Sequence, residues 1–268
     1  MIVAVDTGGT KTLVAVFDTE GRIVAEQKFP TPKAIDQYLV ELKNTVDELV
    51  ADQVITCLSV ALPGTIVDGR MIWAGNLGWH DVDIHALLSD HYDCPIIVEN
   101  DANLAGLAEA RALERPPRVC LYVTVSTGVG TGIVTNGRID PNFSTNEGGQ
   151  IVLEHDGRFE RWEAFASGKA IYEKYGKLAS EIEDPAVWQE IGQNIACGLL
   201  ATCALVRPDI VVIGGGVGTH FDKFKAPLME TMLRASDEKY VPTIIEAAHP
   251  EEAVVYGCYY HAIDTLAD

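Results

Sequence analysis

MIVAVDTGGTKTLVAVFD, residues 1–18, decides the fold of this chain. An apolar strand runs directly into DTGGTK at residues 6–11, and a second apolar strand follows. This order sets the carboxylate of Asp6 beside a glycine turn whose backbone amides are open to an anion. The arrangement suits a phosphate held next to a magnesium ion. An ordinary hairpin that only uses Gly8 and Gly9 to turn is the alternative.

The same scheme returns further along the chain. VCLYVTVSTGVGTGIVTNGRI, residues 119–139, again predicts strand, glycine turn and strand, with Asn136-Gly137 as a hairpin turn. Its small-residue loop comprises Ser126, Thr127, Gly128, Gly130, Thr131 and Gly132. Another glycine loop, residues 214–218, follows an apolar strand. We interpret the repeat as an internal duplication. The first two loops would meet phosphates, and the last would admit a flat adenosine.

Composition excludes several classes of protein. The chain has 268 residues and 47% hydrophobic content, enough for one large or two moderate domains. With 20 Lys and Arg against 39 Asp and Glu, its net charge of −19 disfavours nucleic acid as a partner. No basic, apolar leader is present, and no apolar run approaches about 18 residues, so we expect a cytoplasmic protein without a membrane segment. The 6 cysteines form no CxxC pair and suit reduced core thiols.

Strands and helices alternate along the chain. Apolar residues at helical spacing predict a helix over 34–52, and Pro63-Gly64 ends the buried strand that follows it. Another strand, PIIVEND, runs into a helix that begins just after Asp101. After the 119–139 hairpin we expect an irregular segment to about 166. Helices through 168–206 and near 221–235, strands at 209–213 and 243–248, and a closing helix at 250–266 complete the pattern. No segment fits the P-loop pattern GxxxxGK[ST].

Several motifs together resemble the ROK family of sugar kinases and related repressors. DTGGTK, ENDAN, STGVGTG, EGGQ with EAFASGKA, and IVVIGGGVG occur in the order and rough spacing of that family over nearly the whole chain. The resemblance implies an α/β protein with the actin-like ATPase fold of hexokinases, in which two duplicated RNase H-like domains close over ATP and a sugar. The first domain would span 1–106 plus 250–268, and the second 107–249.

The resemblance also implies an ATP-dependent transfer of phosphate to a glucose-like hexose. Such a transfer needs a base for the hydroxyl proton and a cation that offsets phosphate charge. Asp101 matches the family's catalytic aspartate, although a residue that only caps the following helix would also be an aspartate. Asp6 resembles the carboxylate that holds Mg²⁺, through water. The ATP contacts would be Gly8, Gly9, Thr10, Lys11, Thr127, Gly128, Gly130, Gly215 and Gly216.

The sugar side departs from the family pattern. The implied sugar contacts are Gly64, Asn76, Asn100, Asp101, Glu147, Gln150 and Glu163. The family has a Gly-Glu-x-Gly-His run whose histidine joins a cysteine-rich zinc site, but here that histidine position is Gln150. The following EHDGRFERWEAF contains no cysteine, so a ligand set of one His and three Cys cannot be built and we expect no zinc. We expect His155 to be a surface residue. Gln150 can still donate a hydrogen bond.

Two alternatives to an ATP-dependent kinase stay open. Zinc-free short relatives in the family include polyphosphate-dependent glucokinases, whose long anion favours a basic groove. Here no Lys or Arg other than Lys11 clusters near the phosphate loops in the sequence, which favours ATP. The second alternative is a sugar-binding regulator without turnover. Repressor members carry a helix-turn-helix before the first strand, and here Met1 stands directly at that strand. The family also implies a homodimer.

Overall fold

The computed structural model describes residues 1–75, 77–249 and 252–267. Its contacts divide the chain into two compact units. Unit 1 comprises Met1–Ala108, Arg138–Thr145 and Glu251–Asp268, and unit 2 comprises Glu109–Gly137 and Asn146–Pro250. The sequence-based division at 106/107 and 249/250 lies close to these limits. It puts residues 138–145 in the second domain, whereas they cluster with unit 1.

A five-stranded sheet in the order β3-β2-β1-β4-β8 forms the centre of unit 1. β1 pairs antiparallel with β2 and parallel with β4, which in turn pairs parallel with β8. The strands are β1 (Ile2–Thr7), β2 (Lys11–Phe17), β3 (Ile23–Pro30), β4 (Cys57–Leu62) and β8 (Ile96–Asn100). A smaller sheet in the order β5-β6-β7 consists of β5 (Thr65–Val67), β6 (Arg70–Ala74) and β7 (Trp79–Val82).

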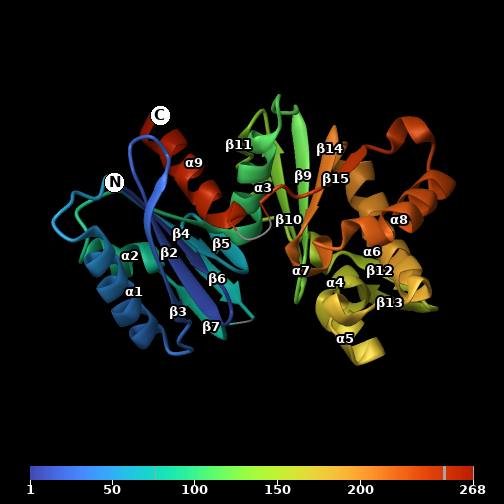
Figure 1. Ribbon diagram of the computed structural model, residues 1–268, viewed down its shortest axis with the longest axis horizontal. Coiled ribbons are helices and arrows are strands. Elements are labelled where there is room, and N and C mark those ends of the chain that lie inside the picture. Colours follow the sequence, from blue (N-terminus) through green and yellow to red (C-terminus); the bar gives the residue numbers. More distant parts are fainter. Residues whose placement is uncertain (76, 250–251, 268) are drawn as a thin grey trace. The chain divides into compact units, whose positions relative to one another are not determined.

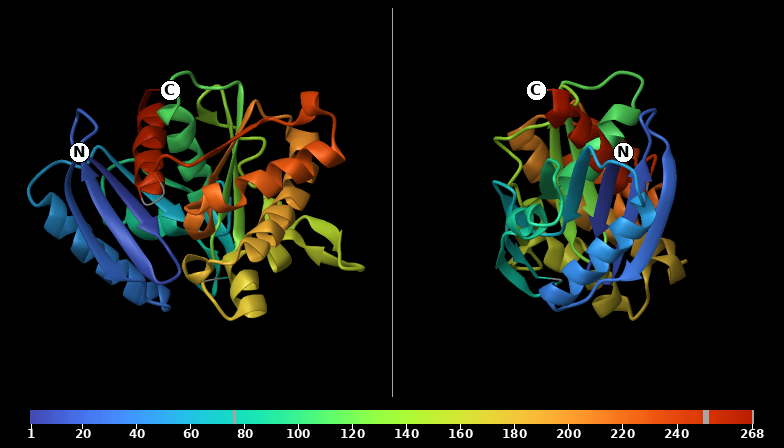
Figure 2. Two further views of the ribbon diagram at one scale, coloured as in Figure 1. Left: turned by 45° about the vertical axis from the view of Figure 1, so that its right-hand side comes forward. Right: turned by 90° about the vertical axis from the view of Figure 1, so that its left-hand side faces the viewer.

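Helices cover both faces of the unit 1 sheet because its central strands are apolar on both sides. Along β1, Val3 and Val5 belong to the core under α1 (Ile35–Val50) and α2 (Ile84–Ser89). Ile2 and Ala4 belong to the opposite core under α3 (Asp101–Ala112) and α9 (Ala253–Ala267). Figures 1 and 2 show α1 on one face of this sheet and α9 on the other. The expected helix over 34–52 is confirmed as α1.

Unit 2 repeats this topology around the strand order β10-β9-β14-β15; the two-residue strand β11 pairs with β10 at the edge of this sheet but belongs to the segment that clusters with unit 1. β9 pairs antiparallel with β10 and parallel with β14, as β1 does with β2 and β4. The strands are β9 (Val119–Val125), β10 (Val129–Thr135), β11 (Arg138–Ile139), β14 (Ile210–Gly214) and β15 (Thr243–Glu246). The helices are α4 (Trp162–Ala166), α5 (Gly168–Tyr175), α6 (Pro185–Val206), α7 (Gly215–Gly218) and α8 (Phe221–Ala235). The 3₁₀ helices are Gly148–Gln150, Ala179–Glu181 and Glu238–Tyr240.

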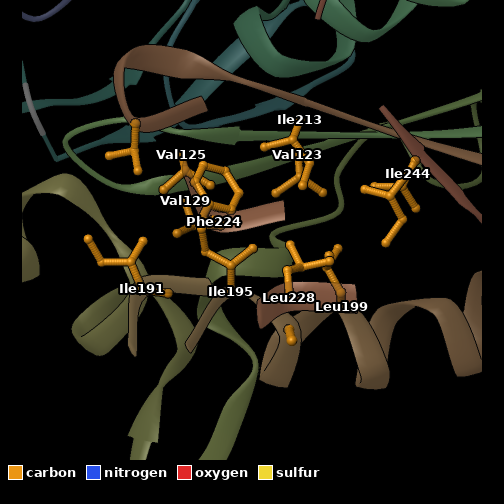
Figure 3. Packing of buried hydrophobic residues seen from close by; sticks show 14 of the residues in the cluster. Val123, Val125, Val129, Ile191, Ile195, Leu199, Ile213, Phe224, Leu228 and Ile244 are labelled. Atoms are coloured by element: carbon orange, nitrogen blue, oxygen red, sulfur yellow. The ribbon is translucent and has the colours of Figure 1, made fainter. Parts of the chain in front are cut away.

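The core of unit 2 joins one face of its sheet to α6 and α8. In Figure 3 the side chains of the sheet lie over those of the two helices. The labelled residues are Val123, Val125, Val129, Ile213 and Ile244 from the strands, Ile191, Ile195 and Leu199 from α6, and Phe224 and Leu228 from α8. This packing fixes the strand ends from which the glycine loops emerge.

The segment that precedes residue 166 is not irregular, contrary to expectation. It contains a hairpin of β12 (Val152–His155) and β13 (Arg158–Arg161), followed by α4. Figure 2 shows this hairpin projecting beside α6. Among the described residues, no helix combines the length and the apolar character that a bilayer crossing requires.

Candidate functional site

The parallel strands β1, β4 and β8 of unit 1 bring their carboxyl ends to one edge of the sheet. Asp6 lies near the end of β1, and Gly64 follows β4. Asn100 pairs with the last residue of β4, and Asp101 follows it. Open α/β sheets bind ligands outside the carboxyl ends of their strands. The register therefore gathers these sequence-predicted residues, Asp6, Gly64, Asn100 and Asp101, at an edge suited to a site. Asn76, another expected sugar contact, lies outside the described residues.

The glycine turn after β1 has its carbonyl groups tied to other residues. The backbone oxygens of residues 8–11 all accept hydrogen bonds. Thr31 donates its Oγ1 hydrogen to the Gly8 oxygen at 2.9 Å, and Lys33 donates from Nζ to the Gly9 oxygen at 2.8 Å. Within the described residues, the N–H groups of Gly9 and Thr10 donate to no other residue. A turn whose carbonyls are occupied and whose amides are unused suits an anion, and an ordinary hairpin does not need this arrangement.

The sequence did not indicate that Lys33 would join this turn. It lies between β3 and α1, where Trp79 Nε1 donates to its backbone oxygen at 2.7 Å, and its ammonium reaches the Gly9 oxygen. Lys28 of β3 also acts electrostatically on Asp6. The expectation that Lys11 is the only cation near the phosphate loops is therefore wrong. The Lys11 side chain itself is exposed at the start of β2.

Burial raises the pKa of the Asp6 carboxyl from 3.8 to about 6, and Lys28 lowers it by a smaller amount. A single carboxylate fits Mg²⁺, which keeps several waters and is bound through one or two carboxylates together with substrate phosphates. Among the described residues, no three His, Cys, Asp or Glu side chains converge as a metal-binding cluster. Asp6 therefore fits an ion of this kind.

Asn100 organises the turn that carries Asp101. Its Oδ1 accepts from the N–H groups of Ala102 at 2.8 Å and Asn103 at 3.2 Å, so it caps α3. Its Nδ2 donates to the Gly64 oxygen at 2.8 Å. Asp101 also accepts from the Ala102 N–H, at 2.8 Å. The capping role that could have explained Asp101 is thus shared with Asn100.

Gly64 is required by its conformation as well as by space. Its φ is +89°, and a Cβ at this position would lie 2.1 Å from the backbone oxygen of Trp73. The Asn100 amide therefore meets a rigid carbonyl. This bond links the end of β4 to the start of α3.

Glu99 is a buried carboxyl next to this turn that the sequence reading left unassigned. Burial raises its pKa above the ordinary value. Its Oε1 accepts from the Asn100 N–H at 2.7 Å and from Asn103 Nδ2 at 2.9 Å. Glu99 thus supports the backbone on which Asn100 and Asp101 stand. ENDAN alone does not distinguish this role from that of a surface acid.

The phosphate loop of unit 2 is shorter than the sequence suggested. Val129 pairs with Val125, so only residues 126–128 connect β9 to β10. Gly130 lies within β10 opposite Thr124, and Thr131 is buried and donates to the Asn146 side chain. The expected loop of residues 126–132 is therefore wrong beyond Gly128. Alternating glycines in a strand resemble a loop by composition alone.

Of the implied sugar residues of unit 2, Glu163 lies against the 126–128 loop. Gln150 donates from Nε2 to Glu163 Oε1 at 2.8 Å. A Cβ at Gly128 would lie 2.9 Å from Glu163 Oε2, so the carboxylate lies directly over that glycine. Glu147 immediately precedes the 3₁₀ helix that contains Gln150. The backbone oxygen of Glu147 accepts the Gln150 N–H at 3.0 Å. Gln150, Glu163 and Gly128 therefore form one cluster.

The last glycine loop follows β14 and forms the single turn α7. Gly215 has φ +81°, and a Cβ there would lie 2.6 Å from Thr124 Oγ1. A Cβ at Gly216 would meet nothing within 4 Å. Gly215 is thus required by the fold, while Gly216 has open space beside it. A flat ligand has room only at the second of these glycines.

His155 is not the surface residue that the sequence suggested. Its side chain is 19% exposed, and its ring stacks on Phe165 with centroids 4.1 Å apart and an interplanar angle of 5°. The polar letters around it, EHDGR, concealed this contact with α4.

The comparisons with known proteins agree with this arrangement. The sequence profile described as "ROK family" matches residues 2–265. The chain belongs to the ROK family. An N-acetylmannosamine kinase from Escherichia coli is 30% identical over 281 residues, covering 95% of this ROK chain and 95% of that protein.

Solved structures share the fold of this ROK protein. A ROK family glucokinase from Streptomyces griseus, in complex with glucose and AMPPNP, matches with a TM-score of 0.82 at 22% identity, over 98% of this chain and 99% of that one. An inorganic polyphosphate/ATP-glucomannokinase from Arthrobacter matches with a TM-score of 0.76 at 27% identity, over 98% of each chain. The expected actin-like ATPase fold is confirmed.

Proposed function

We propose that this protein transfers the γ-phosphoryl group of ATP to a hydroxyl of a hexose, with Asp101 as the general base. The strand register carries the proposal, because it gathers Asp6, Gly64, Asn100 and Asp101 at one edge of the unit 1 sheet. Membership of the ROK family and relatives named as sugar kinases support the reaction class.

Each proposed residue has a defined part in the reaction. The Asp101 carboxylate accepts the proton of the attacking hydroxyl, which raises the nucleophilicity of that oxygen. Asn100 retains one Nδ2 hydrogen beyond its bond to Gly64, and this hydrogen donates to a sugar hydroxyl. The other proposed hexose contacts are Gly64, Glu147, Gln150 and Glu163. Hexose hydroxyls both donate and accept, which suits a set of carboxylates and amides.

Backbone amides and glycines hold the nucleotide in this proposal. Gly8, Gly9, Thr10 and Lys11 meet phosphates in unit 1, while Thr127 and Gly128 do so in unit 2. Gly216, which has open space beside it, lies against the adenosine, and Gly215 shapes the turn that presents it. Asp6 would hold Mg²⁺ through water, and the bound ion offsets phosphate charge. We expect Asp6→Asn to raise the Mg²⁺ concentration needed for half-maximal rate.

The test of the base is an Asp101→Asn variant. We expect kcat to fall by a factor of about 10²–10⁴, the usual contribution of a general base, while hexose binding persists. ADP release is measured with glucose, mannose, fructose and N-acetylated hexosamines, and calorimetry measures binding. Asp52→Asn, which changes an exposed carboxylate on the same unit, is the matched control. An Asp101→Asn enzyme with wild-type kcat would refute this role.

Polyphosphate is a second candidate donor, and the cations around the DTGGTK turn favour it. Lys33 donates to the Gly9 oxygen, and Lys28 acts on Asp6. The Arthrobacter relative, described as using both donors, is 27% identical to this chain. Replacing ATP by polyphosphate in the same assay separates the donors. We expect the rate with ATP to be higher.

A sugar-binding regulator would give a different result. Calorimetry would then detect binding of at least one hexose, and no sugar would release ADP with either donor. That outcome would overturn the kinase proposal for the wild-type protein. The homodimer and the cytoplasmic location stay predictions, and light scattering tests the first.

A further inference from the structure

The position of α4 depends on contacts with other elements. α4 is a helix of five residues, Trp162–Ala166, and it carries Glu163. A helix of this length is unstable alone, because nucleation costs more than a single turn returns. Its N-cap residue, Arg161, makes no side-chain capping bond. Contacts from other elements must therefore set the position of Glu163.

One side of α4 faces the phosphate loop. Glu163 accepts from Gln150 Nε2 at 2.8 Å and lies over Gly128. A lateral movement of α4 would break the bond to Gln150 or press the carboxylate against the loop.

The opposite side of α4 is held by β12 and α6. The His155 ring stacks on Phe165 with centroids 4.1 Å apart. Asn194 Nδ2 donates to the backbone oxygen of Phe165 at 3.2 Å, and the backbone oxygen of Asn194 accepts from Trp162 Nε1 at 3.1 Å. Asn194 thus bonds to both ends of α4 from one position on α6.

His155 and Asn194 also bond to each other. His155 Nε2 lies 3.3 Å from Asn194 Oδ1. Since the amide nitrogen of Asn194 donates to the Phe165 oxygen, Oδ1 is an acceptor and His155 Nε2 carries the hydrogen. The pair therefore has a defined direction of donation.

This side of α4 packs on α6 at its Trp162 end, where a Cβ at Gly198 would lie 1.9 Å from the indole ring, and it borders open space at the exposed Ala164. A cavity of about 570 Å³ adjoins it, and its lining includes His155, Ala164, Phe165, Lys174 and Asn194. An open cavity supplies no packing atoms, so the ring stack and the Asn194 bonds support the helix there.

We propose that His155 and Asn194 are positioning residues that hold α4 from behind and so keep the Glu163 carboxylate at Gln150 and Gly128. The proposal rests on the proposed function, in which Glu163 binds the hexose. Loss of the support allows Glu163 to leave its position, which weakens binding of the hexose more than binding of the nucleotide.

The test compares Michaelis constants for hexose and ATP in His155→Ala, His155→Phe and Asn194→Asp. We expect His155→Ala to raise the hexose KM about tenfold and to leave the ATP KM within about twofold. His155→Phe keeps the ring stack and should give a smaller rise. Asn194→Asp still accepts from His155 but cannot donate to the Phe165 oxygen, so we expect a rise in hexose KM there too. Circular dichroism establishes that each variant is folded, and Asn194→Asp replaces His155→Ala in the comparison if the latter does not fold.

The matched control is Phe159→Ala, because Phe159 is an aromatic residue of the same hairpin with 80% of its surface exposed. Phe159→Ala should have the same Michaelis constants for hexose and ATP as the wild type. Folded variants with an unchanged hexose KM, or with equal rises for hexose and ATP, would overturn this proposal alone. A wild-type protein that neither binds nor phosphorylates a hexose would overturn the proposed function and this role of Glu163 with it.

Discussion

At the scale of single residues, the carboxyl of Asp6 is buried, although the proposed Mg²⁺ contact needs it to be ionised. The protein around it raises the pKa of its carboxyl to about 6. In the unfolded chain the same carboxyl ionises near its ordinary value of about 3.9. Folding therefore disfavours the ionised form that the proposed Mg²⁺ contact requires, and in that proposal the bound ion offsets this cost.

The pH dependence of stability follows from this difference. Between pH 4 and 6 the folded protein retains a proton that the unfolded chain has lost, so the free energy of unfolding falls as pH rises through this interval. Without Mg²⁺ or nucleotide, we expect Asp6→Asn to unfold like wild type near pH 4. Above pH 6 it should be more stable by about 1–3 kcal/mol. Urea denaturation across this range measures the difference. Parallel curves for the two proteins at all pH values would contradict the assignment, and Asp52→Asn provides the reference.

At the scale of elements, α7 separates two adjacent glycines with different requirements. Gly215→Ala forces a side chain into positive φ and against Thr124, which should cost about 1–3 kcal/mol of stability. Gly216→Ala meets open space, so its melting temperature should equal that of wild type. If adenosine lies beside Gly216, this variant should raise the ATP KM at least about fivefold. A Gly216→Ala enzyme with wild-type ATP KM would exclude that contact.

Elements with clear periodicity could be predicted from the sequence. Ile35, Leu39, Leu42 and Val46 recur at helical spacing, and the structure has α1 there. The strand PIIVEND and the helix just after Asp101 were also predicted, because an apolar run and a helical pattern meet at that point, and the structure ends β8 and begins α3 one residue earlier.

The β12–β13 hairpin could not be predicted in this way. Val152 and Phe159 are exposed on it, whereas His155 is mostly buried, so apolar and polar residues do not sort to the faces that usually mark a strand. The contact of Lys33 with Gly9 joins residues 24 positions apart, and the indole of Trp79 holds the Lys33 backbone from a third segment, so no local pattern records it. The motifs of the candidate site could thus be predicted from the sequence. The contacts that hold those motifs in position could not.

At the scale of the whole molecule, the chain passes between its units at 108/109, 137/138, 145/146 and 250/251. Glu109, which begins unit 2, is 2% exposed. Its carboxylate oxygens accept the N–H groups of Ala248 and His249 at 2.7 Å each. One side chain therefore joins the first and last parts of unit 2.

Removal of this carboxylate should destabilise the protein. Glu109→Ala leaves two amides without their charged acceptor, and we expect a loss of about 2–3 kcal/mol. Glu109→Gln keeps one acceptor oxygen, so its stability should lie between those of the wild type and Glu109→Ala. Thermal denaturation followed by circular dichroism measures the effect, with Glu114→Ala as the exposed control. Equal midpoints for Glu109→Ala and Glu114→Ala would refute it.

α9 has a consequence for the order in which the protein is made. It covers one face of the sheet that contains β1. A Cβ at Gly257 of α9 would lie 2.0 Å from the backbone oxygen of Leu104 in α3, so α9 and α3 pack closely. A ribosome delivers β1 early and residues 253–267 only after all of unit 2. Nascent chains must therefore pass through a stage in which unit 2 can fold while Ile2 and Ala4 still lack their final cover. The unit that synthesis begins first is the one it finishes last.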